Sequence, residues 1–222
     1  MKRYLFIISA VMMACISCTK QQEDIPSDNK GEDQKEDVIS PGSKLNINDP
    51  GIAYMWDDSV IPEITIKMEE QEWNSLLFRY DENSHNVDYF HADFTYRKGT
   101  EVTEITDGGI RLRGNTSRRR PEGNHGEAHR RNNPDWHHCH FGINFRKYHK
   151  DSDHTIHGIR KVNLKWFKDD PNYVRELYCY DLFHRYGIWT GAFDVYCRVW
   201  LQIGNETPAY LGVYEMIEPY DN

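Results

Sequence analysis

The sequence lacks an apolar run long enough to cross a membrane as a helix. The apolar run near the start begins at Tyr4 and ends at Ser17, and a spanning helix needs roughly 20 residues. Lys2 and Arg3 precede it, and a short apolar segment behind positive charges is typical of a secretory signal peptide. We therefore expect an exported protein.

Positive charge is also in short supply. The formal net charge is -8 at pH 7, and a chain without a large positive field has no general attraction for the nucleic-acid backbone. Basic residues gather only locally, at residues 118–120 and 130–131. The composition therefore argues against general nucleic-acid binding, and no nucleic-acid partner is expected.

Cysteine is scarce, and the motif of serine hydrolases is missing. Beyond Cys18 the chain has only Cys139, Cys179 and Cys197, an odd number that permits a disulfide in an exported protein without requiring one. Cys179 and Cys197 occupy apolar positions and are expected to be packed thiols. Ser117 has no Gly-x-Ser-x-Gly elbow around it, so Ser/His/Asp catalysis is not supported.

The signal ends at Ser17 and Cys18, as in bacterial lipoproteins, where cleavage precedes a cysteine whose thiol carries lipid. Cys15 stands where such signals usually have Leu, so ordinary cleavage without lipid remains an alternative. The segment that follows is acidic, polar and poor in aromatics, and it cannot bury enough apolar surface to fold. We predict a lipoprotein-type signal peptide at residues 1–17, and a lipidated Cys18 with a disordered acidic tether at residues 18–52. The protein would then be exported to the cell envelope and lipid-anchored to a bacterial membrane, at the outer membrane or cell surface.

The rest of the chain, residues 53–222, is long enough for one domain. Its patterning predicts an α+β fold with several strands, because apolar residues alternate along many short segments. The expected strands are residues 61–67, 89–96, 101–105, 110–113, 141–145, 162–166, 195–203 and 211–217. Asp-Gly-Gly at residues 107–109 predicts a turn, and residues 118–140 form a polar loop of a length that is usually functional or disordered.

Two helices are expected. The first covers residues 68–80, where apolar residues recur three and four positions apart. The second covers residues 171–186, because Asp170 is a good N-cap and Gly187 ends a helix. Its expected apolar face comprises Cys179, Leu182, Phe183 and Tyr186.

Two charged residues lie on or beside this apolar face. Arg175 falls near its centre and Glu176 at its edge. A charge that points toward the packed side of a helix is costly unless it is paired. Arg175 either reaches solvent by snorkelling, or one of the two side chains reaches into a site.

Residues 109–118 read Gly-Ile-Arg-Leu-Arg-Gly-Asn-Thr-Ser-Arg, a short strand that runs into a turn and a basic segment. Gly permits positive φ angles and Asn tolerates them. Short hydroxyl and amide side chains, backbone N–H groups and arginines suit a phosphate. A plain hairpin is the alternative interpretation of the same residues.

In their order and spacing these elements resemble the kinase family of spore-coat protein H (CotH). The residues that carry the resemblance are Trp73, Leu76, Leu77, Gly187 and residues 111–117, 141–145, 162–165, 170–176, 180–183 and 210–218. Members of this family are similar to protein kinases in fold and are thought to phosphorylate protein substrates using ATP and a divalent metal. The resemblance implies a kinase-like N-terminal lobe, mostly antiparallel sheet with two helices, that uses ATP and Mg²⁺ on an unidentified protein substrate.

The resemblance also implies roles for single residues. The turn at residues 113–118 would lie over the ATP phosphates, Glu176 would order a phosphate-binding lysine, and residues 216–220 would hold adenine through backbone hydrogen bonds. The residues expected to bind the cofactor are Arg111, Arg113, Gly114, Asn115, Ser117, Lys165, Glu176 and Glu218.

Two departures from the family pattern matter. Many relatives have Lys-Ser-Tyr or Lys-Ser-Phe entering the strand after the long loop, whereas residues 138–141 here read His-Cys-His-Phe. Lys161, Lys165 or an arginine of the loop could replace that lysine. Kinase chemistry also needs an Asp that orients the hydroxyl, and ligands for Mg²⁺, which in the family lie beyond the hinge. We therefore expect a truncated kinase domain at residues 53–222, without its C-terminal lobe and without activity of its own.

Other interpretations remain open. The run His-His-Cys-His at residues 137–140 has the residue types of a zinc site, but ligands so close together rarely reach one tetrahedral ion. The domain could instead be a non-catalytic surface module that binds a protein or glycan through its many tyrosines and tryptophans. A third possibility is an incomplete gene product that leaves apolar surface uncovered.

Overall fold

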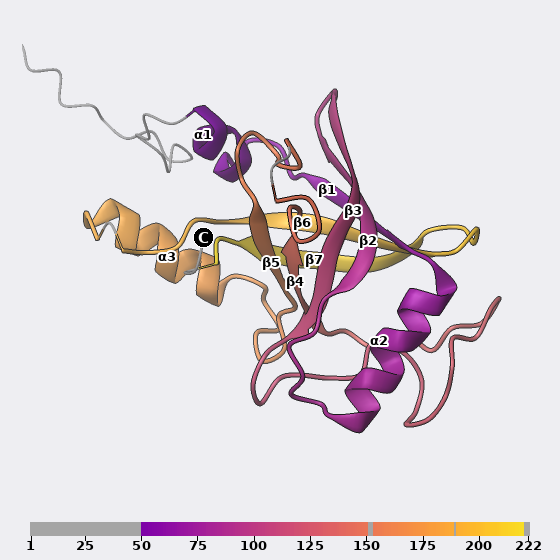
Figure 1. The fold of residues 1–222 in the computed structure, drawn as a ribbon. Coiled ribbons are helices and arrows are strands. Elements are labelled where there is room, and N and C mark those ends of the chain that lie inside the picture. Colours follow the sequence, from indigo (N-terminus) through magenta and orange to yellow (C-terminus); the bar gives the residue numbers. More distant parts are fainter. Residues whose placement is uncertain (1–49, 151–152, 189, 220–222) are drawn as a thin grey trace, which may run out of the picture. The chain divides into compact units, whose positions relative to one another are not determined.

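Seven strands close into a barrel in the computed structural model, which describes residues 50–150, 153–188 and 190–219 (Figure 1). The predicted signal peptide, the lipidation site Cys18 and the tether up to residue 49 lie outside the described residues, as does the end of the predicted hinge at residue 220. In chain order the elements are α1 (Pro50–Trp56), β1 (Glu63–Met68), α2 (Glu70–Glu82), β2 (Phe90–Lys98), β3 (Glu101–Arg113), β4 (His140–Asn144), β5 (Lys161–Lys165), α3 (Arg175–Arg185), β6 (Asp194–Ile203) and β7 (Ala209–Ile217).

A single parallel pairing closes the barrel. The strands follow one another in the order β1-β2-β3-β4-β5-β7-β6, and the neighbours along this order are antiparallel. The two ends of the order meet because β1 runs parallel to β6, with Glu63 opposite Arg198 and Met68 opposite Ile203. Closure of this kind removes the unpaired strand edges that an open sheet would expose.

Alternate residues of each strand fill the barrel interior. Ile64, Ile66 and Met68 of β1 are at most 1 % exposed, and so are Phe94 and Tyr96 of β2. The intervening residues of β1 are half-buried on the outer face. The interior is therefore a packed hydrophobic core, and any site for a polar ligand must be sought on the outer wall or at the barrel ends.

The helices α1 and α2 flank β1 in the chain and lie on different sides of the barrel (Figure 1). Trp73, Leu76 and Leu77 of α2 are buried, which confirms the helix predicted from their spacing. On β2, Lys98 donates hydrogen bonds from Nζ to the carbonyl oxygens of Tyr54 and Asp57, both at 2.6 Å, so that a charged side chain fixes the end of α1. Within the part of the chain that the structure describes, no helix has both the length and the apolar character needed to cross a bilayer.

The predicted architecture of a kinase-like N-terminal lobe, an open and mostly antiparallel sheet with two helices, is wrong. The domain is α+β, but its sheet is a closed seven-strand barrel of mixed direction, accompanied by three helices in the described residues. Apolar alternation locates strands without specifying their partners. Nothing in residues 61–67 indicated that this strand would pair with β2 on one side and with β6 on the other.

The predicted turn at residues 107–109 does not end the strand, because β3 continues from Glu101 to Arg113. The strand is irregular at this point: its register with β2 shifts opposite residues 92–94, and Asp107 has a φ of 54°. The glycines serve close packing instead. A Cβ on Gly108 would lie 2.7 Å from a ring carbon of Phe94, and one on Gly109 would lie 2.6 Å from Lys147 Cβ. Both distances are too short for a side chain, so glycine is what allows β3 to pass these neighbours.

The closing pair can be tested by cross-linking. Lys67 of β1 lies opposite Gln202 of β6, and neighbouring strands are about 5 Å apart, within the usual Cα separation of a disulfide. In a Cys179→Ser background, Lys67→Cys with Gln202→Cys should form a disulfide under mild oxidation, detected by mass spectrometry of tryptic peptides. As a control, Lys67→Cys with Tyr210→Cys should not, because β7 lies on the far side of β6. Equal yields from the two pairs would contradict the closed barrel.

Candidate functional site

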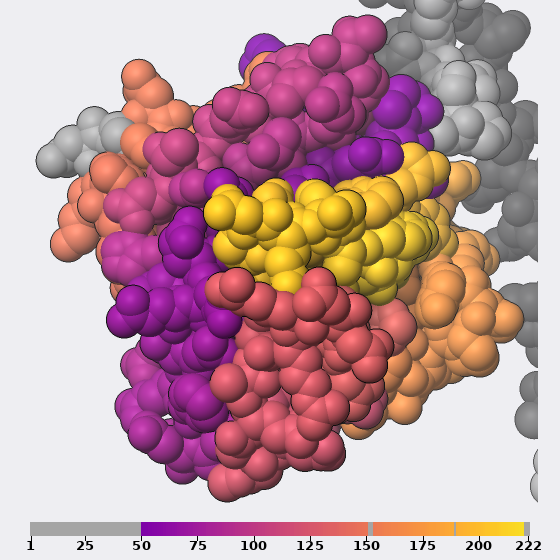
Figure 2. Space-filling view, turned by 90° about the vertical axis from the view of Figure 1, so that its right-hand side faces the viewer, coloured from indigo at the N-terminus to yellow at the C-terminus, as the bar shows by residue number. Residues whose placement is uncertain are grey.

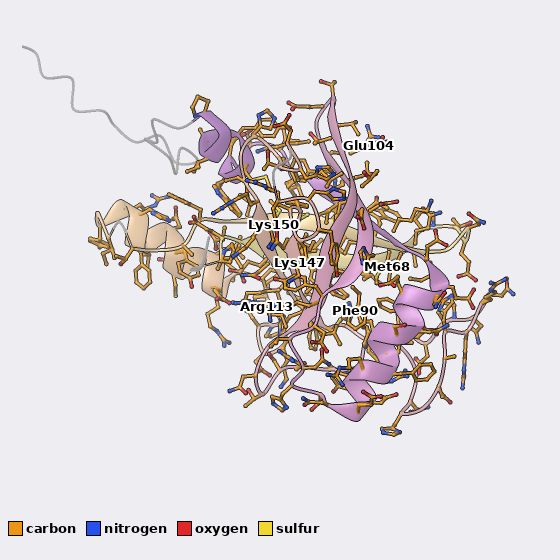
Figure 3. All side chains as sticks on the ribbon, viewed as in Figure 1. Met68, Phe90, Glu104, Arg113, Lys147 and Lys150 are labelled. Atoms are coloured by element: carbon orange, nitrogen blue, oxygen red, sulfur yellow. The ribbon has the colours of Figure 1, made fainter. Side chains whose placement is uncertain are left out.

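A strip of polar side chains crosses the outer wall of the barrel on five neighbouring strands. The inward residues of β5 are Val162 and Leu164, which are fully buried, so Lys165 must point outward. In the strand register Arg113 of β3 lies opposite His140 of β4. Lys165 lies opposite Glu215 of β7, which in turn lies opposite Tyr196 of β6. Figure 3 labels Arg113 where β3 ends.

Lys165 is the centre of this strip. Its Nζ forms a short ion pair with Glu176 Oε1 in the first turn of α3, and it lies 3.7 Å from Glu215 Oε2. The Lys165 side chain is 21 % exposed, whereas that of Glu215 is 1 % exposed. One cation therefore stands between a carboxylate on a surface helix and a carboxyl group in the barrel wall.

The start of α3 aims Glu176 at β5. The carboxylate of Asp170 accepts hydrogen bonds from the backbone N–H groups of Val174 at 2.8 Å and Arg175 at 2.6 Å. These bonds hold the pKa of Asp170 below its usual value. The helix thus begins at Arg175 rather than at Pro171 as expected, because the intervening residues form a turn in which Tyr173 has a φ of 57°.

The face of α3 that was expected to pack is mostly open. Leu177 is the buried residue of the helix, while Phe183 is 41 % and Tyr186 is 80 % exposed and Cys179 is also exposed. Arg175 is exposed as well, in agreement with the snorkelling alternative. Glu176 turns toward β5, and Asp181 of the same helix faces a separate hollow beside Val195 and Tyr196 of β6.

A cleft of about 450 Å³ opens between α3 and the outer wall. Aromatic side chains supply its apolar surface, and the Lys165 group supplies its charge. Its lining comprises His140, Lys165, Trp166, Phe167, Lys168, Asp169, Asp170, Arg175, Glu176, Cys179, Tyr180, Phe183 and Glu215.

His140 connects this cleft to the turn that follows β3. Its Nδ1 accepts a hydrogen bond from the backbone N–H of Trp166 at 2.9 Å. Burial, with the nearby charges of Lys165 and Arg113, lowers the pKa of His140 to about 4, so that the ring is neutral at pH 7. A Cβ on Gly114 would lie 3.3 Å from His140 Cδ2, which places the turn in contact with this ring.

The turn itself is tight. Gly114 has a φ of 110°, and a Cβ there would lie 2.8 Å from Ser117 Oγ. Asn115 is exposed and Ser117 is half-buried. Arg118 donates from Nε to the carbonyl oxygen of Gly114 at 3.0 Å, so this arginine braces the turn rather than standing free for a ligand.

Two predicted cofactor residues stand apart from this cleft. The guanidinium of Arg111 lies over the ring of Tyr89, 5.4 Å from its centroid, and its Nε is buried. The backbone N–H of Glu218 donates to the carbonyl oxygen of Phe193 at 2.8 Å. Of the eight predicted residues, Lys165 and Glu176 line the cleft. Gly114 and Arg113 are neighbours of His140, which lines the cleft as well.

Most arginines of the long loop have structural partners. Arg120, which is buried, donates to both carboxylate oxygens of Asp81 at 2.9 and 3.1 Å. Glu122 is 1 % exposed and accepts hydrogen bonds from Trp73 Nε1 at 2.7 Å and the backbone N–H of Arg130 at 2.9 Å. Figure 2 shows the loop as a broad surface beside α2 and below the β6–β7 hairpin.

The histidine run does not converge on one point. His137 contacts the carbonyl oxygen of Arg120 at 3.1 Å through Nδ1, and His138 contacts that of Leu211 at 3.0 Å through Nε2. His140 faces Trp166. Across the residues with described placement, no group of three or more His, Cys, Asp or Glu is arranged to hold a metal ion.

Sequence reasoning missed His140 and Glu215 as members of the site. The expected core face of the last strand was Leu211, Val213 and Ile217, but Tyr214 and Met216 are the fully buried inward residues. Glu215 then lies on the outer wall. A charged residue within the apolar run Tyr-Glu-Met-Ile costs free energy unless it is paired. The sequence could therefore have indicated that Glu215 has a charged partner.

The anchoring of the loop leads to a stability prediction. Arg120→Ala would leave the buried carboxylate of Asp81 without its partner and should lower the free energy of unfolding by about 3–5 kcal/mol. Arg119→Ala is the matched control, because Arg119 is exposed and surface changes usually stay within about 0.5 kcal/mol. Urea denaturation followed by tryptophan fluorescence measures both, and equal losses would contradict the assigned role of Arg120.

Comparison of the chain with models of known protein families gave no match, and a search of curated proteins gave none either.

Proposed function

We propose that this protein supplies the nucleotide-binding part of a protein kinase of the spore-coat protein H kind, and that it binds the phosphates of ATP at Lys165. The observation that carries the proposal is the ion pair of Lys165 on β5 with Glu176 on α3. In protein kinases a lysine on a strand and a glutamate on a helix form such a pair, and both must be in place for phosphoryl transfer.

The location of the pair supports a ligand at this point. Lys165 and Glu176 both line the cleft, and Lys165 remains partly exposed there. A lysine held by a single carboxylate keeps further N–H donors for a phosphate oxygen. Among the candidates left open by the sequence, the loop arginine Arg131 pairs with Glu70 of α2, which is not part of this cleft, whereas Lys165 pairs with Glu176 within the cleft lining.

The rest of the cleft suits a nucleotide in general character. Small-molecule sites combine apolar walls with a few placed polar groups, and Trp166, Tyr180 and Phe183 offer such walls here. The Gly114 turn lies against His140, at the edge of the same cleft. Mg²⁺, which the resemblance implies, finds no group of three or more His, Cys, Asp or Glu arranged to hold it among the described residues.

The N-terminal pattern supports a location for the protein. A lipid on Cys18 would attach it to a bacterial membrane in the cell envelope, with an unidentified protein as substrate. The support is the pattern of residues 1–18, in which a positive start and a short apolar run lead to a cysteine.

A surface module for a protein or glycan is the second candidate function. The observation in its favour is a larger hollow of about 800 Å³, formed by the long loop, the start of α2 and the β6–β7 turn. Trp136, three glutamates and two asparagines contribute to its lining. Aromatic surface beside amide and carboxylate groups can both stack on a ligand and bind it by hydrogen bonds.

ATP binding by the full chain tests the first candidate. Lys165→Ala should weaken ATP binding, measured by isothermal titration calorimetry, by about 10- to 100-fold, because a hydrogen bond to a charged group contributes about 1.5–3 kcal/mol.

Lys161→Ala is the matched control for this measurement. Lys161 lies on the same strand, opposite Asn144, and is not part of the cleft lining. ATP binding that is unaffected by Lys165→Ala, or lost equally in both variants, would contradict the proposed site.

The second candidate has its own test. A panel of neutral oligosaccharides titrated into the protein should produce a saturable change in tryptophan fluorescence that Trp136→Phe removes. Trp200→Phe, on the outer face of β6 beside Tyr210, should leave it in place. Absence of any saturable change would count against glycan binding at this hollow.

A further inference from the structure

Glu215 is a buried acid at the wall of the proposed ATP cleft. It lies in the middle of β7, opposite Lys165 on β5 and Tyr196 on β6. Its residue exposure is 1 %, and its Oε1 has no hydrogen-bond partner within the described part of the chain. A buried polar atom without a partner costs free energy, and this one belongs to a residue that lines the cleft.

Two carboxyl groups compete for one lysine. Glu176 makes the close contact with Lys165, and Glu215 Oε2 lies 3.7 Å from the same Nζ. With Glu176 ionised, the pair is neutral overall. A second negative charge on Glu215 would make the group net negative, which repels phosphate and occupies the lysine.

Burial raises the pKa of Glu215 to about 8, with Lys165 opposing the rise and the charges of Glu176 and Asp194 adding to it. A hydrogen bond between the carboxyl groups of Glu215 and Glu176 raises it further. The usual pKa of Glu is about 4.3, so Glu215 stays neutral at pH 7 and ionises as the pH rises through about 8.

Other groups that face Glu215 can be separated from it. His140 on β4 has a pKa of about 4, and the pKa of Tyr196 on β6 is raised above its usual value by burial and by Asp170, Asp194 and Glu215. Neither changes charge between pH 7 and 9. The groups that face Glu215 from neighbouring elements are Lys165 on β5, Glu176 on α3, and Asp194 and Tyr196 on β6. Cys179 also lines the cleft, and a Cys179→Ser background removes its thiol from the comparison.

We propose that the protonation state of Glu215 decides whether the cleft accepts nucleotide phosphates. As a neutral acid it leaves Lys165 available to a phosphate. As a carboxylate it forms an ion pair with Lys165 and repels the phosphates of the nucleotide. This inference rests on the proposed function, since it concerns the same site.

The experiment is a pH series of ATP affinity by isothermal titration calorimetry, using the full chain with Cys179→Ser, and the same chain with Glu215→Gln. The neutral fraction of an acid with a pKa of about 8 falls from about 0.9 at pH 7 to about 0.1 at pH 9, so the affinity should fall about tenfold. Glutamine cannot ionise, and the Glu215→Gln profile should be flat. The ratio of the two affinities at each pH cancels the ionisation of ATP itself.

The possible outcomes separate the two proposals. Binding at pH 7 that persists unchanged to pH 9 in the Glu215 protein overturns the role of Glu215 and leaves the ATP site standing. An equal fall in both proteins assigns the pH dependence to another group, which also overturns it. No binding at pH 7 in the Glu215 protein overturns the proposed function, and the inference with it. Urea unfolding at pH 7 and 9 verifies that both proteins remain folded throughout.

Discussion

The parallel pairing of β1 with β6 is the constraint on which the rest of the structure depends. It joins the two ends of the sheet, and a closed sheet has only an interior and an outer wall. Because the interior is filled by apolar side chains such as Ile66 and Phe94, every charged residue of the strands must lie on the wall or be paired. The polar strip of β3, β4, β5, β7 and β6 follows from this division.

Within the strip, the charge of Lys165 organises the candidate site. Its neighbours differ in how firmly they are held, since Glu215 belongs to a strand with partners on both sides and Glu176 belongs to a helix that buries one side chain. The lysine therefore links a rigid wall to a loosely attached element. Because both β7 and α3 line the cleft, a ligand that binds Lys165 would also affect the position of α3.

Local patterns predicted the elements well where one face is buried against a continuous core. The spacing of Trp73, Leu76 and Leu77 is an example, since all three are buried in α2. The same reasoning assigned the wrong face to α3 and to β7, because both faces of these elements carry apolar residues and only tertiary contacts decide which one is covered. The partners of each strand could not be predicted either, because the closing pair joins segments 135 residues apart and alternation says nothing about pairing.

For the site, the family resemblance implied a role for Glu176 and left Lys165 open beside Lys161 and a loop arginine, and the structure brings the side chains of Lys165 and Glu176 together. His140 and Glu215 depend on the register of β4 and β7 with β5, which has no short-range signal.

The sparse packing of α3 has a consequence for its motion. Segments with few buried apolar contacts open locally at a smaller free-energy cost than a barrel strand does. Leu177, the stack of His184 on Phe193 and the bond from Glu176 to Lys165 are among the contacts that retain this helix. The attachment of α3 is thus partly electrostatic. An anion that binds Lys165 in place of Glu176 therefore also weakens the attachment of the helix to the barrel.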